Sequence, residues 1–181
     1  MANQDPFLDD DYEVPEEPGN YMKLEKGNNR FRAMSSPILG WEWWTEDEDG
    51  KHPNRVHTKD EVPKEAWHGQ QRPKHFWAML VWNYELETPQ ILEFTQKTIQ
   101  KEIRELVKDD DWGSPAGDDG YDIVVTRKGE QLNTEYTVMP KPAKKLNGDI
   151  LEVFKELYCN LDALYDSDDP FENPDNADTP F

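Results

Sequence analysis

The chain has 181 residues, a formal charge of −19 at pH 7 and a mean hydropathy of −1.02, values that suit one soluble domain with polar extensions. Its single cysteine, Cys159, excludes an intramolecular disulfide or a site of several thiolates, and favours a reducing cytoplasm. No stretch approaches the roughly 18 apolar residues of a membrane span, and the acidic start lacks the pattern of a secretory signal.

The negative charge is concentrated at the two ends of the sequence. Residues 1–20 and 160–181 each carry seven acidic residues and no lysine or arginine. All twenty basic residues therefore lie between these flanks, where the net charge is only −5. Both flanks are poor in apolar residues, so we expect disordered acidic segments over 1–20 and 166–181. The overall charge consequently does not exclude a nucleic-acid partner for the middle segment.

Two strands are predicted at the start of this middle segment. Residues 29–34 alternate polar and apolar side chains with period two, and 38–44 continue in a β-rich composition after Ser36-Pro37. Residues 45–72 are polar and contain Pro, Gly and His, which indicates a long loop or a small β excursion.

A buried strand and a helix follow. Residues 75–84 form a nearly continuous apolar run, which is typical of a strand covered on both faces, and 90–94 return after a turn at 87–89. Thr95 is the predicted N-cap of a helix whose apolar face repeats at helical spacing. The apolar residues on that face are Ile99, Ile103, Leu106 and Val107.

A second strand pair and a second helix complete the pattern. Residues 121–126 and 134–139 are predicted strands, and Gly129 between them can take a positive φ. Residues 149–164 have the spacing of an amphipathic helix. A helix between the third and fourth main strands is the connectivity of the OB-fold, a five-stranded partly open barrel. We therefore predict a mainly β, OB-fold-like domain over 21–142, and a linker with an amphipathic helix over 143–165.

Aromatic residues lie among basic residues in the first strands and could bind single-stranded nucleic acid. Exposed rings stack on bases at roughly 1–3 kcal/mol each, while Lys and Arg follow the phosphates. Alternation places Trp41 and Trp43 on one strand face and Trp44 with Glu42 on the other. The alternative for these rings is a role in the core, which we favour for at least one of Trp77 and Trp82. The predicted DNA-binding residues are Lys23, Lys26, Arg30, Phe31, Arg32, Trp41, Trp43, Trp44, Trp77, Arg127 and Lys128.

Catalytic and metal-binding patterns are weak in this sequence. Four histidines occur between positions 52 and 75, but they lack the close spacing on one element of a zinc or iron site. Acidic runs such as 109–111 follow a helix and are more typical of solvated turns. No phosphate-binding Gly loop or nucleophile–base pair is present. We expect neither enzymatic activity nor a cofactor or metal.

The acidic tail ends in Asp178, Thr179, Pro180 and Phe181. It resembles the C-terminal peptide of bacterial and phage single-stranded DNA-binding proteins. Its carboxylates repel phosphate, and an aromatic end can dock in a basic-rimmed apolar pocket on a partner. We therefore predict that Asp178, Pro180 and Phe181 bind a partner protein. The alternative is an ordinary disordered acidic segment.

Several sequence blocks resemble a family of tailed-phage single-stranded DNA-binding replication proteins. They span about residues 21–142 and include the segments 21–24, 29–32, 40–44, 75–78, 91–100, 112–113, 121–123, 126–130 and 134–138. The resemblance implies an OB-type fold that coats single-stranded DNA without sequence preference, with a tail that recruits replication or recombination proteins in the host cytoplasm. Residues 45–72 lie outside the matched blocks.

The leading hypothesis is thus a non-catalytic single-stranded DNA-binding protein with no membrane partner. The alternative from another class is an acidic DNA mimic or adaptor that occupies the DNA site of a host protein, an idea prompted by the charge of −19. A mimic would carry its acid on the folded surface, whereas here fourteen of the nineteen excess charges lie in the flanks.

Overall fold

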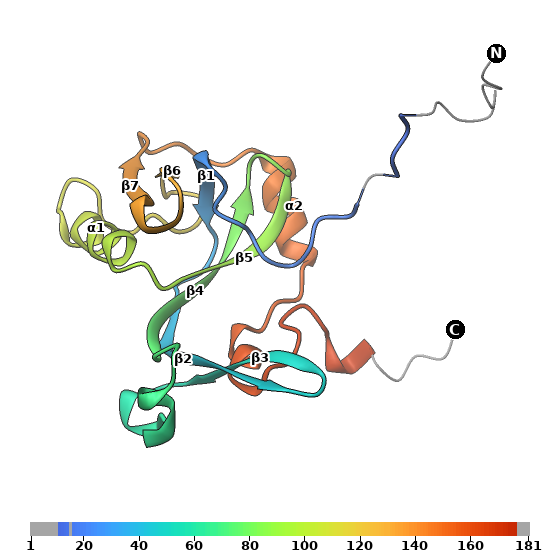
Figure 1. Cartoon of the computed structure of the whole chain (residues 1–181). Helices are drawn as coiled ribbons and strands as arrows, with labels where there is room; N and C mark the ends of the chain where they lie inside the picture. The colour runs from blue at the N-terminus through green and yellow to red at the C-terminus, as the bar shows by residue number, and fades with distance from the viewer. Residues whose placement is uncertain (1–10, 15, 177–181) are drawn as a thin grey trace, which may run out of the picture.

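The computed structural model describes residues 11–14 and 16–176 and is mainly β, with an antiparallel sheet at its centre (Figure 1). Its strands are β1 (Gly27–Ala33), β2 (Ile38–Asp47), β3 (Gly50–Val56), β4 (Lys74–Asn83), β5 (Thr88–Phe94), β6 (Ile123–Lys128) and β7 (Glu135–Pro140). The α-helices are α1 (Lys97–Lys108) and α2 (Gly148–Glu156). The 3-10 helices are η1 (Lys59–Glu61), η2 (Lys64–His68), η3 (Gln131–Asn133), η4 (Leu161–Asp166) and η5 (Pro174–Asn176).

Strand β4 organises the sheet because three strands pair with it. β2 pairs with its first half and β1 with its last residues, as the registers Gly40↔Phe76 and Phe31↔Asn83 show. β5 pairs with β4 over Trp77↔Phe94 to Asn83↔Thr88. β3 extends the sheet beyond β2, while β6 and β7 extend it beyond β1. β1 and β2 are thus two parts of one bent path along β4.

The sheet remains open within the described residues. β7 pairs with β6 alone and β5 with β4, apart from an isolated bridge from Tyr21 to Ile91, so the expected five-stranded barrel is not closed there. Helix α1 lies beside β7, and the Glu102 carboxylate accepts a hydrogen bond of 2.7 Å from the Val138 backbone N–H. A side chain therefore satisfies a donor on this strand that a further strand would otherwise take.

The prediction of a strand buried on both faces is confirmed for β4. Met79 and Val81 belong to the main core with Phe31, Leu92 and Ile123. Phe76 and Ala78 point to the opposite face and belong to a second cluster with Ile91 and Leu164. Alternating side chains of a strand point to opposite faces, so one apolar strand supplies two cores.

The C-terminal segment covers this second face. Leu164 of η4 is buried there, Phe171 packs against the same cluster, and the Asn160 N–H donates to the Pro170 carbonyl over 2.8 Å. The prediction that the tail begins at Asp166 was therefore wrong, because residues up to Phe171 join the fold. The 3-10 helix η4 and the turn after it suffice for this packing, although the segment contains few apolar residues.

The two predicted helices differ from expectation at their ends. α1 begins after Gln96 rather than Thr95, and no side-chain hydrogen bond caps it, whereas the burial of Ile99 and Ile103 is as predicted. The second predicted helix divides into α2 and η4. The chain is extended at Leu157, and the Asn160 side chain then accepts a hydrogen bond from the Asp162 N–H to start η4.

Residues 45–72 contain the β excursion that the sequence allowed. β2 continues to Asp47 and forms a hairpin with β3, with Gly50 at φ 118° in the turn, and η1 and η2 follow.

Among residues 11–14 and 16–176, no helix is both long and apolar enough to cross a membrane.

Candidate nucleic-acid interface

The predicted tryptophans of β2 lie on the β2–β3 hairpin, where the following loop folds back on them. Trp41 packs against Trp67 of η2 and His75 of β4, with ring centroids 5.8 and 5.5 Å away. His75 is oriented by a contact of 2.8 Å from its Nδ1 to the Gly40 carbonyl. Because Trp41 is half-buried, it has a structural role but keeps exposed ring surface.

A lysine lies over this aromatic pair. The Lys59 Nζ is 5.2 Å from the Trp67 ring centroid and 5.5 Å from that of Trp41. A cation at such a distance is attracted by the electron-rich ring face. The same ammonium is exposed to solvent and can meet a phosphate on a strand whose base contacts the rings.

Trp43 and Trp44 line a cleft of about 510 Å³ between β2 and the loop before β4. β4 pairs with β2 only as far as Glu42, so the later part of β2 has a free edge that faces this loop. Lys51 of β3, Gln70 and Gln71 also line the cleft, together with the acidic residues Glu46 and Glu65. Trp44 is 46% exposed, which is a large apolar surface for a protein of this polarity.

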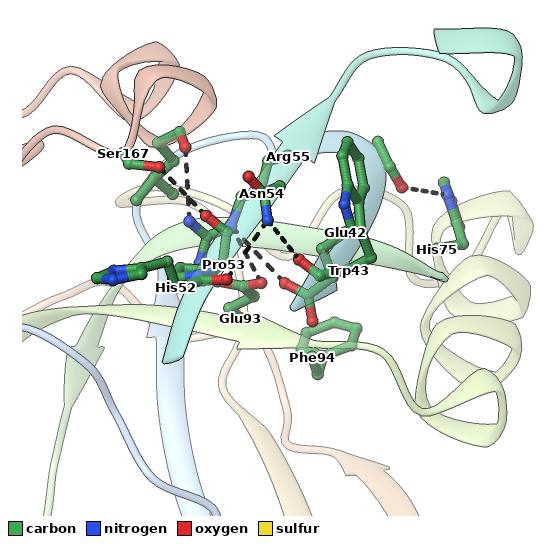
Figure 2. A network of polar contacts seen from close by, with 12 residues as sticks. Glu42, Trp43, His52, Pro53, Asn54, Arg55, His75, Glu93, Phe94 and Ser167 are labelled. Carbon is green, nitrogen blue, oxygen red and sulfur yellow. Dashed lines mark hydrogen bonds and ion pairs between the residues drawn. The ribbon is translucent and has the colours of Figure 1, made fainter. Parts of the chain in front are cut away.

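A buried charge cluster lies on the same strand face as Trp44. Glu42 of β2, Arg55 of β3 and Glu93 of β5 point toward one another (Figure 2). Arg55 donates to Glu93 with an Nη2–Oε2 distance of 2.7 Å, whereas its Nε is 3.7 Å from Oε2 of Glu42, which has no hydrogen-bond partner.

The electrostatic state of this cluster follows from its burial. Desolvation and the neighbouring Glu93 carboxylate together raise the pKa of Glu42 to about 8. Near neutral pH the Glu42 carboxyl is therefore mostly protonated, and Arg55 pairs with Glu93. Trp44, Tyr21 and Gln96 line a cleft of about 370 Å³ above this cluster. A neutral Glu42 removes one negative charge from beside the exposed tryptophan.

Two predicted DNA-binding residues were wrongly assigned to the surface. Phe31 has no exposed surface and lies in the main core. Arg32 is 1% exposed and donates to Asp122 and to the backbone carbonyls of Gly117 and Lys144. The alternation in 29–34 thus stops at Phe31, because β1 is covered on both faces from there on. Neither side chain can stack on a base or meet a phosphate in this arrangement.

Three other predicted residues have partners within the protein. Arg30 is partly exposed, but its Nε and Nη2 both donate to Oδ2 of Asp122, over 2.9 and 2.7 Å. Trp77 is half-buried and packs on Phe94 with ring centroids 5.6 Å apart. Arg127 donates to the Leu24 carbonyl over 3.0 Å. These three side chains, which the sequence predicted to bind DNA, therefore make contacts that stabilise the fold.

The remaining predicted lysines lie at the other end of the sheet. Lys23, Lys26 and Lys128 are exposed near the start of β1, where Gly27 pairs with Arg127 of β6. Lys26 also forms an exposed ion pair of 3.3 Å with Glu130. In Figure 1 this end lies opposite the β2–β3 hairpin. The predicted site residues therefore separate into a tryptophan group and a distant lysine group.

Trp67, Lys59 and Lys51 were missed by the sequence reasoning. They lie in residues 45–72, which no matched block covers. A usable signal was present, since this stretch contains a further tryptophan among several basic residues. Only the hairpin fold brings these side chains to Trp41, Trp43 and Trp44.

The predicted partner-binding residues Asp178, Pro180 and Phe181 lie outside the described residues. Among residues 11–14 and 16–176, no group of three or more His, Cys, Asp or Glu side chains is placed to bind a metal ion.

Comparison of the chain with models of protein families, with curated proteins and with solved structures finds no match.

Proposed function

We propose that the protein binds single-stranded DNA without sequence preference, with the β2–β3 hairpin as its contact surface. The observation that carries this proposal is the cleft formed by Trp43, Trp44 and Lys51, beside the Trp41–Trp67 pair and its lysine. Flat rings with free surface suit any base, and nearby ammonium groups suit the repeating phosphates. Such a surface needs no reaction, so the proposed role is non-catalytic.

The strand order supports an OB-type fold for this role. Without β2 and β3, the order is β5-β4-β1-β6-β7, with α1 between β5 and β6 in the chain. This order and helix position agree with the expected OB connectivity, and the β2–β3 hairpin would then be an elaboration of the loop after the first strand. In OB-folds that loop is one of those that contact oligonucleotides. The resemblance to tailed-phage replication proteins leads to the same proposal.

Fluorescence anisotropy of labelled oligo-dT at graded salt concentrations tests the proposal. Trp43→Ala combined with Trp44→Ala should weaken binding by about 1–3 kcal/mol for each ring that stacks. Leu132→Ala removes a fully exposed apolar side chain from η3, away from the hairpin, and should leave affinity unchanged. Binding that is insensitive to the tryptophan pair would rule out the hairpin as the contact surface.

The contribution of charge is measured in the same assay. Lys51→Gln and Lys59→Gln should each lower the slope of log affinity against log salt by roughly 0.7, the value per phosphate contact for a single strand. Lys155→Gln on α2 is the matched control, because this exposed lysine pairs with Glu152. An unchanged slope for all three variants would show that the hairpin lysines do not meet phosphate.

The same titration addresses the alternative of an acidic DNA mimic or adaptor. If the chain binds no oligonucleotide at low salt, but retains a nucleic-acid-binding protein from a purified set, the mimic is favoured.

We further propose that the acidic tail with Asp178, Pro180 and Phe181 recruits replication or recombination proteins. Phe181→Ala should then leave oligo-dT affinity unchanged and reduce the binding of such a partner.

A further inference from the structure

A second apolar groove lies away from the hairpin cleft, between α1 and the bend that joins β1 to β2. Its volume is about 380 Å³, within the range of pockets that accept a side chain or small ligand. Met79, Ile103 and Ile123, all nearly fully buried, form the floor. The floor is therefore continuous with the main core.

Two large apolar side chains at the groove have exposed surface. Leu39 of β2 and Val107 of α1 are 47% and 46% exposed and line opposite sides. Pro37 and Pro115 extend the apolar lining. Exposed apolar groups gathered around one hollow mark a surface that is covered in an interaction.

The rim adds positive charge. Arg104 and Lys108 lie one helical turn apart on α1, and both line the groove. Neither forms an ion pair or a side-chain hydrogen bond with another described residue. An apolar floor with two free cations is complementary to an apolar side chain that is flanked by carboxylates.

The C-terminal segment of this chain has that chemistry. Residues 172–181 contain Glu172, Asp175 and Asp178, no basic residue, and an aromatic residue at Phe181. We propose that this groove binds the acidic segment around Phe181 of a second copy of the chain. The Phe181 ring enters between Leu39 and Val107, and Asp178 lies near Arg104 and Lys108.

The occupant comes from a second copy because the groove and the packed segment around Phe171 lie on opposite faces of β4. Trp77 and Met79 line the groove, whereas Phe171 packs with Phe76 and Ala78 on the other face. In Figure 1, η5 lies on the side of β3 that is away from α1. The five residues after Asn176 reach at most about 18 Å when extended. To fill its own groove, a chain would have to lead these five residues around the edge of the sheet, whereas the tail of a second copy can approach the groove directly.

Sedimentation equilibrium of the full chain tests this contact without nucleic acid. The apparent mass should rise from 21.2 kDa toward twice that value with protein concentration, and should fall back as salt is added. Phe181→Ala and the double variant Arg104→Glu/Lys108→Glu should each lose this concentration dependence. Lys97→Glu/Lys101→Glu is the control, because it makes the same charge change on α1 outside the groove lining.

Mixing the two defective variants makes the test specific. Phe181→Ala retains an intact groove and Arg104→Glu/Lys108→Glu retains an intact tail, so their mixture should regain association. Thermal melts should show that each variant is folded, since the altered charges are exposed.

Four results would overturn the proposal. These are a monomeric wild type at all concentrations, an equal loss in the Lys97/Lys101 control, wild-type association by Phe181→Ala, and no recovery in the mixture. Because nucleic acid is absent from the experiment, its outcome is independent of the proposed DNA binding.

Discussion

Arg32 and Asp122 form a buried ion pair in which the Arg32 Nε donates to Oδ1 of Asp122 over 2.7 Å. The same carboxylate also accepts from Arg30 and from the Tyr84 hydroxyl, the latter over 2.8 Å. Burial, together with the hydrogen bond to Asp122 and its charge, raises the pKa of Tyr84 to about 12, so the hydroxyl remains a donor at ordinary pH. One carboxylate thus joins β1, the end of β4 and the start of β6.

Removal of this carboxylate should be strongly destabilising. Asp122→Ala leaves Arg32 buried without a counter-charge, and we expect a loss of about 3–5 kcal/mol in the free energy of unfolding. Urea denaturation at pH 7 measures it. Lys26→Ala, which breaks the exposed pair with Glu130, is the control and should cost less than about 1 kcal/mol. Comparable losses for the two variants would show that the buried network contributes little.

Stability should fall with rising pH because of Glu42. Its pKa is raised from 4.5 to about 8 on folding, so the folded state binds this proton more tightly than the unfolded state. The stabilising effect of the bound proton is complete below pH 4.5 and is lost between about pH 4.5 and 8. Glu42→Gln mimics the protonated form and should be more stable than the wild type at pH 9, on the order of a few kcal/mol.

Chemical denaturation at pH 5, 7 and 9 compares the Glu42→Gln variant with the wild type. Glu46→Gln is the control, since Glu46 lies on the same strand face but is exposed. A pH dependence that persists unchanged in Glu42→Gln would place its source elsewhere.

Gly40 should not tolerate a side chain. A Cβ at this position would collide with the Val56 carbonyl oxygen and lie 2.9 Å from the Phe76 ring, where β2, β3 and β4 meet. We expect Gly40→Ala to lower the free energy of unfolding by about 1–3 kcal/mol. Gly148→Ala at the start of α2 meets no atom within 4 Å and should be neutral or slightly stabilising. Thermal melts of both variants measure the difference in stability, and equal melting midpoints would contradict the predicted collision at Gly40.

The C-terminal segment should contribute to stability only as far as its packed part. Removing residues 177–181 leaves every described contact in place and should not change the melting temperature at a protein concentration too low for association. Removing 167–181 also deletes Pro170 and Phe171, exposes the cluster around Phe76, and should lower the melting temperature clearly. Circular dichroism melts of the two shortened chains measure this difference. The same melting temperature for both would mean that Phe171 adds nothing to the fold.

The sequence predicted elements well where one physical signal dominated. The apolar run of β4, the periodicity of α1 and the positive φ of Gly129 were all read from local pattern. Phe31 and Arg32 were misread, because alternation in a strand does not tell whether a second layer covers its polar face. In β1 such a layer exists, and the buried Arg32 is satisfied by Asp122, which is ninety positions away.

The candidate site shows the same division between local and distant information. From the sequence, Trp41, Trp43 and Trp44 were predicted to alternate on one strand, because side-chain direction is a property of the local backbone. The packing of Trp67 on Trp41, the coverage of Phe76 by Leu164 and the raised pKa of Glu42 beside Glu93 join residues 26 to 88 positions apart. Composition and periodicity carry no information about such pairs. Only the tertiary structure decided them, because burial and electrostatics depend on which segments the fold brings together.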